Sequence, residues 1–172
     1  MKERMVALEF DSVINKRTSV RKYLKKGVLA EDIKAVIDCG KRAPAACNLR
    51  ALETMVITDE SDKTKIVNTT YKGSIRNNNG IQSWMLSAPV FLIIYMDMDK
   101  CKKKYGEDDY KKDAYLNASA SIENMLLKAV DLGMGSCYVT GFREKELTSF
   151  INIDNDKEVI AILTLGYEDK AK

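Results

Sequence analysis

Residues 88–96 read APVFLIIYM, and this stretch indicates the class of fold more clearly than any other part of the chain. Every residue from 90 to 96 is apolar or aromatic, without the polar-apolar alternation of a half-exposed strand. A strand of this kind is buried on both faces. The stretch therefore predicts a central strand in a sheet that other elements cover on both sides. It is far too short to cross a bilayer as a helix, so we expect no membrane association.

The longest helix is predicted after this strand, over residues 113–132. Gly133 follows it, at the position where helices commonly end. Apolar residues recur along one face at helical spacing, as expected of a helix that packs on a sheet. The residues that mark this face are Ala118, Ile122, Met125, Leu126, Ala129 and Val130.

Shorter helical and β-rich patterns alternate through the rest of the chain. Asp11 is expected to cap a short first helix, and a second helix should run from residue 30 and end before Pro44. Further helices are expected over 59–68 and 143–150, and strands over 55–58, 136–140 and 159–165. This alternation favours an α/β or α+β sheet covered by helices. We expect one domain spanning residues 1–172.

Two segments are expected to lie outside the regular elements. Residues 69–83 are polar and rich in Asn and Gly, which predicts a mobile loop with some helix. Such a loop serves either as a lid over a pocket or as a surface insertion, and the sequence does not separate the two. Residues 97–113 are highly charged, which predicts a solvated excursion.

Composition excludes several classes of function. The chain of 172 residues has 28 Lys plus Arg against 25 Asp plus Glu and no histidine, for a net charge of +3. Without histidine, no Ser-His-Asp or Cys-His nucleophile and no catalytic His base is possible. The small positive charge is unlike that of a dedicated nucleic-acid binder, so we expect no nucleic-acid partner.

The four cysteines predict neither a metal site nor a thioredoxin motif, because they are widely spaced without a CxxC pair. The N-terminus lacks the apolar stretch that a signal peptide needs. We therefore expect a cytoplasmic protein with reduced thiols.

Residues 17–21, RTSVR, are a candidate phosphate-binding segment. They offer two guanidinium groups, on Arg17 and Arg21, and two hydroxyl groups, on Thr18 and Ser19. Arginine binds phosphate through a planar fork of donors and keeps its charge near neutral pH. Taken alone, this string fits a solvated basic turn better.

Two further segments can line a flat ligand. Residues 42–48, RAPAACN, contain small residues that allow close approach, and Asn48 offers a donor and an acceptor. Residues 132–142 end a predicted strand at Thr140 and Gly141, where backbone N–H groups become available and glycine has no Cβ in the way. Taken alone, each of these two segments fits an ordinary turn better.

Together and in this order, these segments resemble the FMN-dependent nitroreductase family. The resemblance covers nearly the whole chain. The matching strings are RTSVRKY at 17–23, APAACN at 43–48, Ala88-Pro89, LGMGSC at 132–137 and LTLGY at 163–167.

The resemblance implies an α+β fold with a central mixed sheet flanked by helices, built as an intertwined homodimer. It implies that Arg17, Thr18, Ser19 and Arg21 hold the phosphate and the pyrimidine side of an FMN at the subunit interface. The implied residues along the ring, contributed by the partner chain, are Pro44, Ala45, Ala46 and Asn48. Thr140 and Gly141 would face its N5 edge through their backbone.

The implied activity is transfer of hydride from NADH or NADPH, and of electrons to nitroaromatics, quinones or a related oxidised acceptor, in a ping-pong cycle. The flavin would carry this chemistry, so no catalytic side chain is expected and the missing histidine is no obstacle. A non-catalytic flavin-binding protein of the same fold is the main alternative. A basic interaction module that uses residues 17–26 ranks below both.

The chain departs from the family pattern at two places near the expected site. After Asn48 the family usually continues with Gln-Pro-Trp or a similar string, whereas this chain has Arg50 at the middle position, which adds a cation. Beyond the last strand, Lys170 or Lys172 would have to replace the basic residue that reaches the phosphate in many relatives. Cys47 and Cys137 are expected near the pocket, where packing is a better explanation for them than a redox role.

Overall fold

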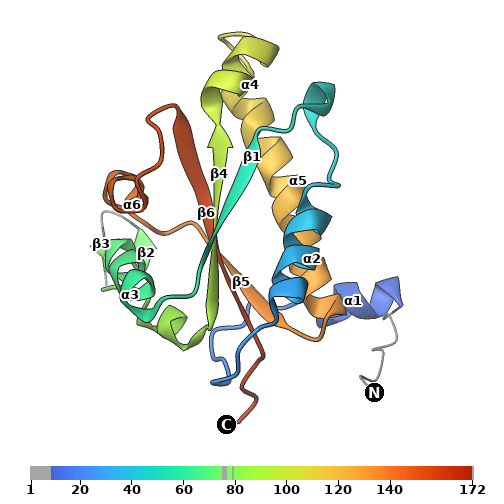
Figure 1. The fold of residues 1–172 in the computed structure, drawn as a ribbon, viewed down its shortest axis with the longest axis vertical. Coiled ribbons are helices and arrows are strands. Elements are labelled where there is room, and N and C mark those ends of the chain that lie inside the picture. Colours follow the sequence, from blue (N-terminus) through green and yellow to red (C-terminus); the bar gives the residue numbers. More distant parts are fainter. Residues whose placement is uncertain (1–8, 75–76, 79, 172) are drawn as a thin grey trace.

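The computed structural model describes residues 9–74, 77–78 and 80–171. Its centre is a four-stranded sheet in the order β1-β4-β6-β5, in which all neighbours are antiparallel (Figure 1). The strands are β1 (Leu52–Ile57), β4 (Val90–Asp97), β5 (Gly135–Val139) and β6 (Lys157–Gly166). Every residue of β4 is buried, which confirms the expected central strand.

Helices cover both faces of this sheet, because the side chains of β4 point alternately into two apolar cores. Phe91 and Ile93 lie in one core, and Leu92 and Ile94 in the other. The helices α3 (Glu60–Thr69) and α6 (Glu144–Ile151) lie on one side of the sheet, and α2 (Ala30–Gly40) and α5 (Tyr110–Asp131) on the other (Figure 1). The expected fold class, an α+β sheet flanked by helices, is confirmed.

The long helix α5 has the predicted apolar face. Its expected core residues are all buried, and they pack on α2 and on the sheet. Gly133 follows the C-cap residue Leu132 with a φ of 71°, a left-handed conformation that glycine adopts without a steric penalty. The chain then turns back directly into β5.

The first helix, α1 (Phe10–Lys16), begins slightly earlier than expected. Glu9 occupies the N-cap position, so the prediction that Asp11 is the cap was wrong. Asp11 lies in the first turn instead, where its charge suits the positive end of the helix dipole. After α1 the chain is extended and crosses the end of β5, where Ser19 and Ser136 form a parallel bridge. The four named strands are all antiparallel, and this isolated bridge is the one parallel pairing among the described residues.

Two of the irregular segments have more regular structure than expected. Much of the charged segment forms α4 (Met98–Tyr105), where Met98 and Cys101 are buried and Asp97 caps the helix by accepting from the Lys100 N–H at 2.8 Å. Residues 73–78 contain a short hairpin of β2 (Gly73–Ser74) and β3 (Asn77–Asn78), which the prediction of a loop with some helix missed. The structure does have a 3-10 turn, η2 (Ser83–Ser87), just after this hairpin. Residues 75–76 and 79 of the expected loop lie outside the described residues.

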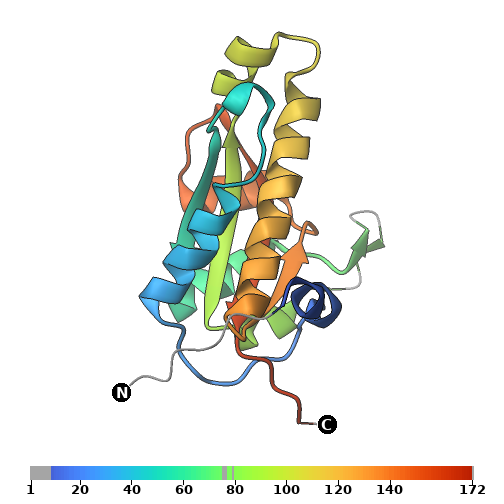
Figure 2. The ribbon, with the colours of Figure 1, turned by 90° about the vertical axis from the view of Figure 1, so that its right-hand side faces the viewer.

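No helix in the described part of the chain is long and apolar enough to span a membrane. Figure 2 shows the same fold from the side, with α4 at one end of the molecule and α1 near the other.

Candidate functional site

The segment 17–21 is fixed to the sheet through its backbone. The Val20 N–H donates to the Ser136 carbonyl at 3.0 Å, and the Val20 side chain is buried. Three residues further on, the buried Tyr23 hydroxyl donates to the Val20 carbonyl at 2.7 Å. Because that hydrogen bond uses the only proton of the Tyr23 hydroxyl, the hydroxyl oxygen accepts a second hydrogen bond from Thr164 Oγ1 at 2.7 Å. The extended segment is thus tied to β5 and β6.

Arg21, Thr140 and Gly141 line one cavity of about 450 Å³. The cavity opens beside the end of β5, and Tyr71, Gln82 and Trp84 also line it. The Arg21 guanidinium lies 5.8 Å from the centre of the Trp84 ring, within the range of a cation–π contact. The structure therefore brings together two parts of the predicted site that are more than a hundred residues apart in sequence.

The backbone at Gly141 is shaped for close contact. A Cβ at this position would lie 3.0 Å from the Tyr71 carbonyl oxygen and 3.1 Å from Gln82 Nε2. The Gly141 carbonyl accepts from the Tyr71 N–H at 2.9 Å and from Gln82 Nε2 at 3.2 Å, which fixes the orientation of its peptide group. No described residue accepts a hydrogen bond from the N–H groups of Thr140 and Gly141, so both remain available to a ligand.

Cys137 lies beneath the segment 17–21 and is buried. Burial raises the pKa of its thiol, while Arg21, a hydrogen bond with Ser19, and Arg17 act in the opposite direction. Arg17, Ser19 and Arg21 are therefore all close to this sulfur. A thiol with a raised pKa stays protonated near neutral pH, which agrees with a packing role.

Thr18 lies on the other side of the segment. It lines a second cavity, of about 640 Å³, together with Lys16, Gly133 and Lys170. The alternation of an extended chain explains this division, because Thr18 and Val20 point away from the side that Ser19 and Arg21 occupy. Lys170 is thus the described basic residue of the tail that lies beside this segment. Lys172 lies outside the described residues.

The loop 42–48 is held on the opposite side of the chain by α4 and α5. The Ala46 N–H donates to Asn117 Oδ1 at 3.0 Å, and the Ala46 carbonyl accepts from the Tyr105 hydroxyl at 2.9 Å. Asn117 Nδ2 in turn donates to the Tyr105 hydroxyl at 2.9 Å. Burial raises the pKa of Tyr105, so its hydroxyl remains a donor. Both backbone groups of Ala46 are therefore fixed.

The end of this loop has an uncommon backbone. Cys47 and Asn48 adopt φ angles of 50° and 54°, in the left-handed region that few residues other than glycine visit. Arg50 holds this conformation by donating to the Lys41 carbonyl at 2.6 Å, the Ala43 carbonyl at 3.2 Å and Asn48 Oδ1 at 2.7 Å. Non-glycine residues in such conformations cluster at functional sites. Pro44, Cys47 and Asn48 are exposed, and Ala45 and Ala46 are partly buried.

One chain does not bring the two halves of the predicted site together. The loop lies toward the α4 end of the molecule, whereas the segment 17–21 lies near α1 at the other end (Figures 1 and 2). Neither of the two cavities beside the segment is lined by residues of the loop.

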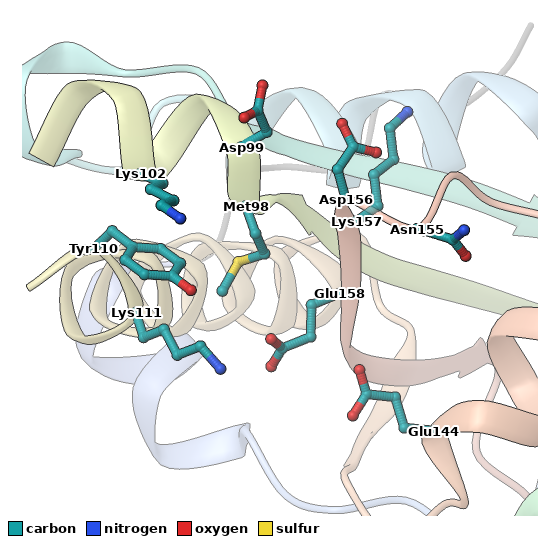
Figure 3. Close-up of a pocket in the computed structure, with 10 residues that line it drawn as sticks. All are labelled: Met98, Asp99, Lys102, Tyr110, Lys111, Glu144, Asn155, Asp156, Lys157 and Glu158. Carbon is teal, nitrogen blue, oxygen red and sulfur yellow. The ribbon is translucent and has the colours of Figure 1, made fainter. Parts of the chain in front are cut away.

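A further cavity, of about 350 Å³, lies between α4, the start of α5 and the start of β6 (Figure 3). Lys111 and Glu144 lie on either side of Glu158, whose carboxylate accepts from the Tyr115 hydroxyl at 2.5 Å. Burial, and then the charge of Glu158, raise the pKa of Glu144. Charges of both signs line this cavity, and no predicted site residue does.

Several residues of the site were not predicted from the sequence. Tyr71 and Gln82 lie in the segment 69–83, for which a lid over a pocket was one of the two expectations, and Trp84 follows it directly. Tyr105 and Asn117 reach the loop 42–48 from helices far along the chain, and no local pattern marks such contacts.

Comparison with known proteins identifies the family to which the chain is similar. The model of the nitroreductase family matches residues 14–167. Over 93% of its length the chain is 24% identical to "Putative NAD(P)H nitroreductase MhqN" of Bacillus subtilis, 89% of which is covered. It is 26% identical over 86% of its length to the FMN reductase [NAD(P)H] of the same organism, of which it spans 56%.

The fold is also that of solved members. A nitroreductase family protein from Clostridium novyi superposes with a TM-score of 0.83 at 22% identity, covering 95% of this chain and 87% of the other. Because the family model spans most of the chain, the expectation drawn from the sequence is confirmed: the protein belongs to the nitroreductase family.

Proposed function

We propose that the protein is an FMN-dependent oxidoreductase that takes hydride from NADH or NADPH and passes electrons to nitroaromatics, quinones or a related oxidised acceptor in a ping-pong cycle. The observation that carries this proposal is the cavity where Arg21 meets the backbone of Thr140 and Gly141. The relatives named NAD(P)H nitroreductase and FMN reductase agree with both the enzyme class and the cofactors expected from the sequence.

The residues of this cavity fit an FMN. Among the described residues, none forms an ion pair with Arg17 or Arg21, so these residues leave both positive charges available to an anionic ligand. The N–H groups of Thr140 and Gly141 are available as donors, and only glycine fits at position 141 without displacing its neighbours. A bound FMN would supply the hydride and electron transfer.

The chain's own residues would bind and orient this cofactor. Arg17 and Ser19, on the same side of the segment as Arg21, are assigned to the phosphate and the ribityl chain. Thr18 and Lys170 line the cavity on the other side of the segment, so their expected contact with the phosphate requires the ligand to reach past the segment. Arg21 would supply a cation for the pyrimidine side of the cofactor. The N–H groups of Thr140 and Gly141 would donate hydrogen bonds to the ring, and the adjacent Trp84 would limit the entry of water.

The second half of the site would come from a partner chain in a homodimer. Exposed or partly buried residues of the loop 42–48 are Pro44, Ala45, Ala46 and Asn48. The loop lies toward the opposite end of the molecule from the segment 17–21 (Figures 1 and 2). A second copy that presents this loop would complete the cavity. Exposed apolar residues provide surface for such contact: Phe10 and Ile14 on α1, Tyr115 and Leu116 on α5, and Tyr138 on β5.

We also propose a cytoplasmic location, since all four cysteines are free.

Absorption spectra of the purified protein, saturated with FMN under anaerobic conditions, test this function. We expect flavin bands that bleach when NADH or NADPH is added and return when a quinone or nitroaromatic follows. Bands that persist with both nicotinamides would favour the non-catalytic flavin-binding protein. Failure to bind FMN at any concentration would rule out the assignment.

A further inference from the structure

Arg50 occupies the middle position of the string that is usually Gln-Pro-Trp in the family, and its contacts differ from those of a surface cation. Its guanidinium donates to three oxygen atoms at once, two on the backbone after α2 and one on the Asn48 side chain. No carboxylate of the described residues pairs with it. Arg50 therefore acts on the loop 42–48 through hydrogen bonds.

The contact with Asn48 settles which end of that amide faces outward. A guanidinium has only donors, so the Asn48 atom at 2.7 Å from Arg50 must be the acceptor Oδ1. The amide nitrogen, Nδ2, then points the other way, and no described residue accepts its hydrogens. Without Arg50, the amide is free to turn and present either atom.

The backbone at Cys47 and Asn48 fixes the place from which the Asn48 side chain projects. Asn48 has a left-handed φ of 54°, and the preceding Cys47 has a φ of 50°, so the two residues form a sharp turn. Asn117 and Tyr105 hold this turn from beneath through Ala46, while Arg50 holds it from the outer side. The position of the Asn48 side chain is thus fixed by contacts on both sides of the loop.

We propose that Arg50 is a positioning residue that fixes Asn48 with its amide nitrogen toward the cofactor, so that the loop presents a hydrogen-bond donor and never an acceptor. This rests on the proposed function, in which Asn48 lines the flavin ring. The ring has carbonyl oxygens and a deprotonatable edge that accept hydrogen bonds, so a fixed donor favours its binding and its reduced, more negative state. Arg50 acts through Asn48 and need not touch the cofactor.

A double-mutant cycle with Arg50→Met and Asn48→Ala, read by FMN titration, tests this coupling. We expect each single change to weaken FMN binding about tenfold, the size expected for one hydrogen bond to a well-placed donor. The double variant should be no weaker than Asn48→Ala alone, because Arg50 then has no side chain to orient. Effects that multiply would show that Arg50 acts independently of Asn48 and would overturn the proposal.

Charge reversal separates orientation from simple electrostatics. In Arg50→Glu the new carboxylate accepts from Asn48 Nδ2, which turns the amide and presents Oδ1 to the cofactor. Arg42→Glu is the matched control, because Arg42 is also exposed and no described residue pairs with its side chain. We expect Arg50→Glu to weaken FMN binding at least about tenfold more than Arg42→Glu and to lower the flavin reduction potential. Equal effects of the two variants would overturn the proposal.

The rate of thiol labelling in FMN-free protein measures the conformation of the loop 42–48 without the cofactor, through the accessibility of Cys47. Cys47 is exposed, while Cys101 and Cys137 are buried and Cys39 is partly buried. We expect Arg50→Met to change the labelling rate of Cys47 several-fold, and Arg42→Met to leave it unchanged. If the unaltered protein binds no FMN, the proposed function fails and this inference with it. If FMN binds and the cycle is additive, only this inference fails.

Discussion

The segment 17–21 and the loop 42–48 are expected to face the same cofactor, yet different kinds of contact hold them. The segment is fixed by backbone pairing with β5, by the buried Val20 and by the Tyr23 hydroxyl. The loop has short-range backbone hydrogen bonds of its own, but its contacts with distant parts of the chain come from the side chains of Tyr105 and Asn117, and Arg50 adds a third side-chain contact. Backbone pairing tolerates many sequences, whereas a loop held by side chains depends on their identity.

This difference indicates in which half substitutions change the geometry of the site. Substitutions in the segment mainly change what it offers to the ligand, because its course follows the sheet. Substitutions at Arg50, Tyr105 or Asn117 change where the loop lies. We therefore expect substitutions in the loop half to change the geometry of the site more than substitutions in the segment 17–21.

The largest effect, on FMN affinity, is expected when the segment 17–21 is altered in one chain of the dimer and the loop 42–48 in the other. Arg21→Ala and Asn48→Ala are each expected to weaken FMN binding about tenfold to a hundredfold, since each removes a hydrogen-bonding or charged contact. In a dimer purified with one tag on each variant, one site carries both changes and the other carries neither. Titration should then show one site of unaltered affinity per dimer. Two equally weakened sites would mean that both halves come from the same chain.

The next effect tests how the segment 17–21 is fixed. In Gly135→Ala the new Cβ would lie 2.6 Å from Val20 Cγ2 and 2.9 Å from its Cβ, so the segment must shift. We expect the free energy of unfolding to fall by about 1–3 kcal/mol, as for an overpacked core. Urea denaturation measures this change. Gly27→Ala is the control, because a Cβ at that position would have no neighbouring atom within 4 Å, and it should change stability little.

A smaller effect is expected beneath the loop. Asn117→Ala removes the acceptor of the Ala46 N–H and the donor to the Tyr105 hydroxyl, which should lower the free energy of unfolding by about 1–2 kcal/mol and weaken FMN binding. Asn117→Asp keeps the acceptor for Ala46 and should cost less. The two measurements are denaturation and FMN titration. Unchanged FMN affinity in Asn117→Ala would show that the loop holds its position without this contact.

The smallest effect concerns α4, which carries Tyr105. Burial alone would raise the pKa of Asp97, but hydrogen bonds from the Lys100 side chain and backbone outweigh it and hold the pKa below its ordinary value of 3.8. A depressed carboxyl pKa stabilises the fold above that value, and this stabilisation is lost as the pH falls through the lower, folded-state value.

Asp97→Asn tests this pH dependence. Asparagine still caps the helix but cannot titrate, so about 1 kcal/mol or less should separate the two proteins near neutral pH. The difference in unfolding free energy should shrink as the pH is lowered below 3.8. A difference that stays constant down to about pH 2 would contradict the assignment of the charge at Asp97.

Long periodic patterns made much of the fold predictable. The apolar run of β4 and the helical face of α5 are strong local signals, and Gly133 marks the end of α5 correctly. The hairpin near Gly73 and the helix α4 were missed, because short elements rich in polar residues are stabilised by contacts with the rest of the fold.

The segments that form the candidate site could be predicted from the sequence, but their positions relative to one another could not. The sequence offered Arg21 and Gly141 as separate candidates, and only the fold places them in one cavity. The contact between Arg50 and Asn48 depends on a left-handed turn. Asparagine adopts this conformation more readily than most residues, but Cys47 precedes it and cysteine does not, so the sequence did not predict the turn. Contacts such as that of Tyr105 with Ala46 join distant parts of the chain, and no periodic pattern in the sequence marks them.

The placement of the two halves toward opposite ends of the chain has a consequence for anyone who dilutes the protein. If each site needs two chains, cofactor retention and self-association are linked by mass action, and each strengthens the other. Loss of flavin colour would then depend on the concentration of the protein as well as on that of FMN. Assays at nanomolar enzyme would report a mixture of assembled and dissociated protein unless excess FMN were present.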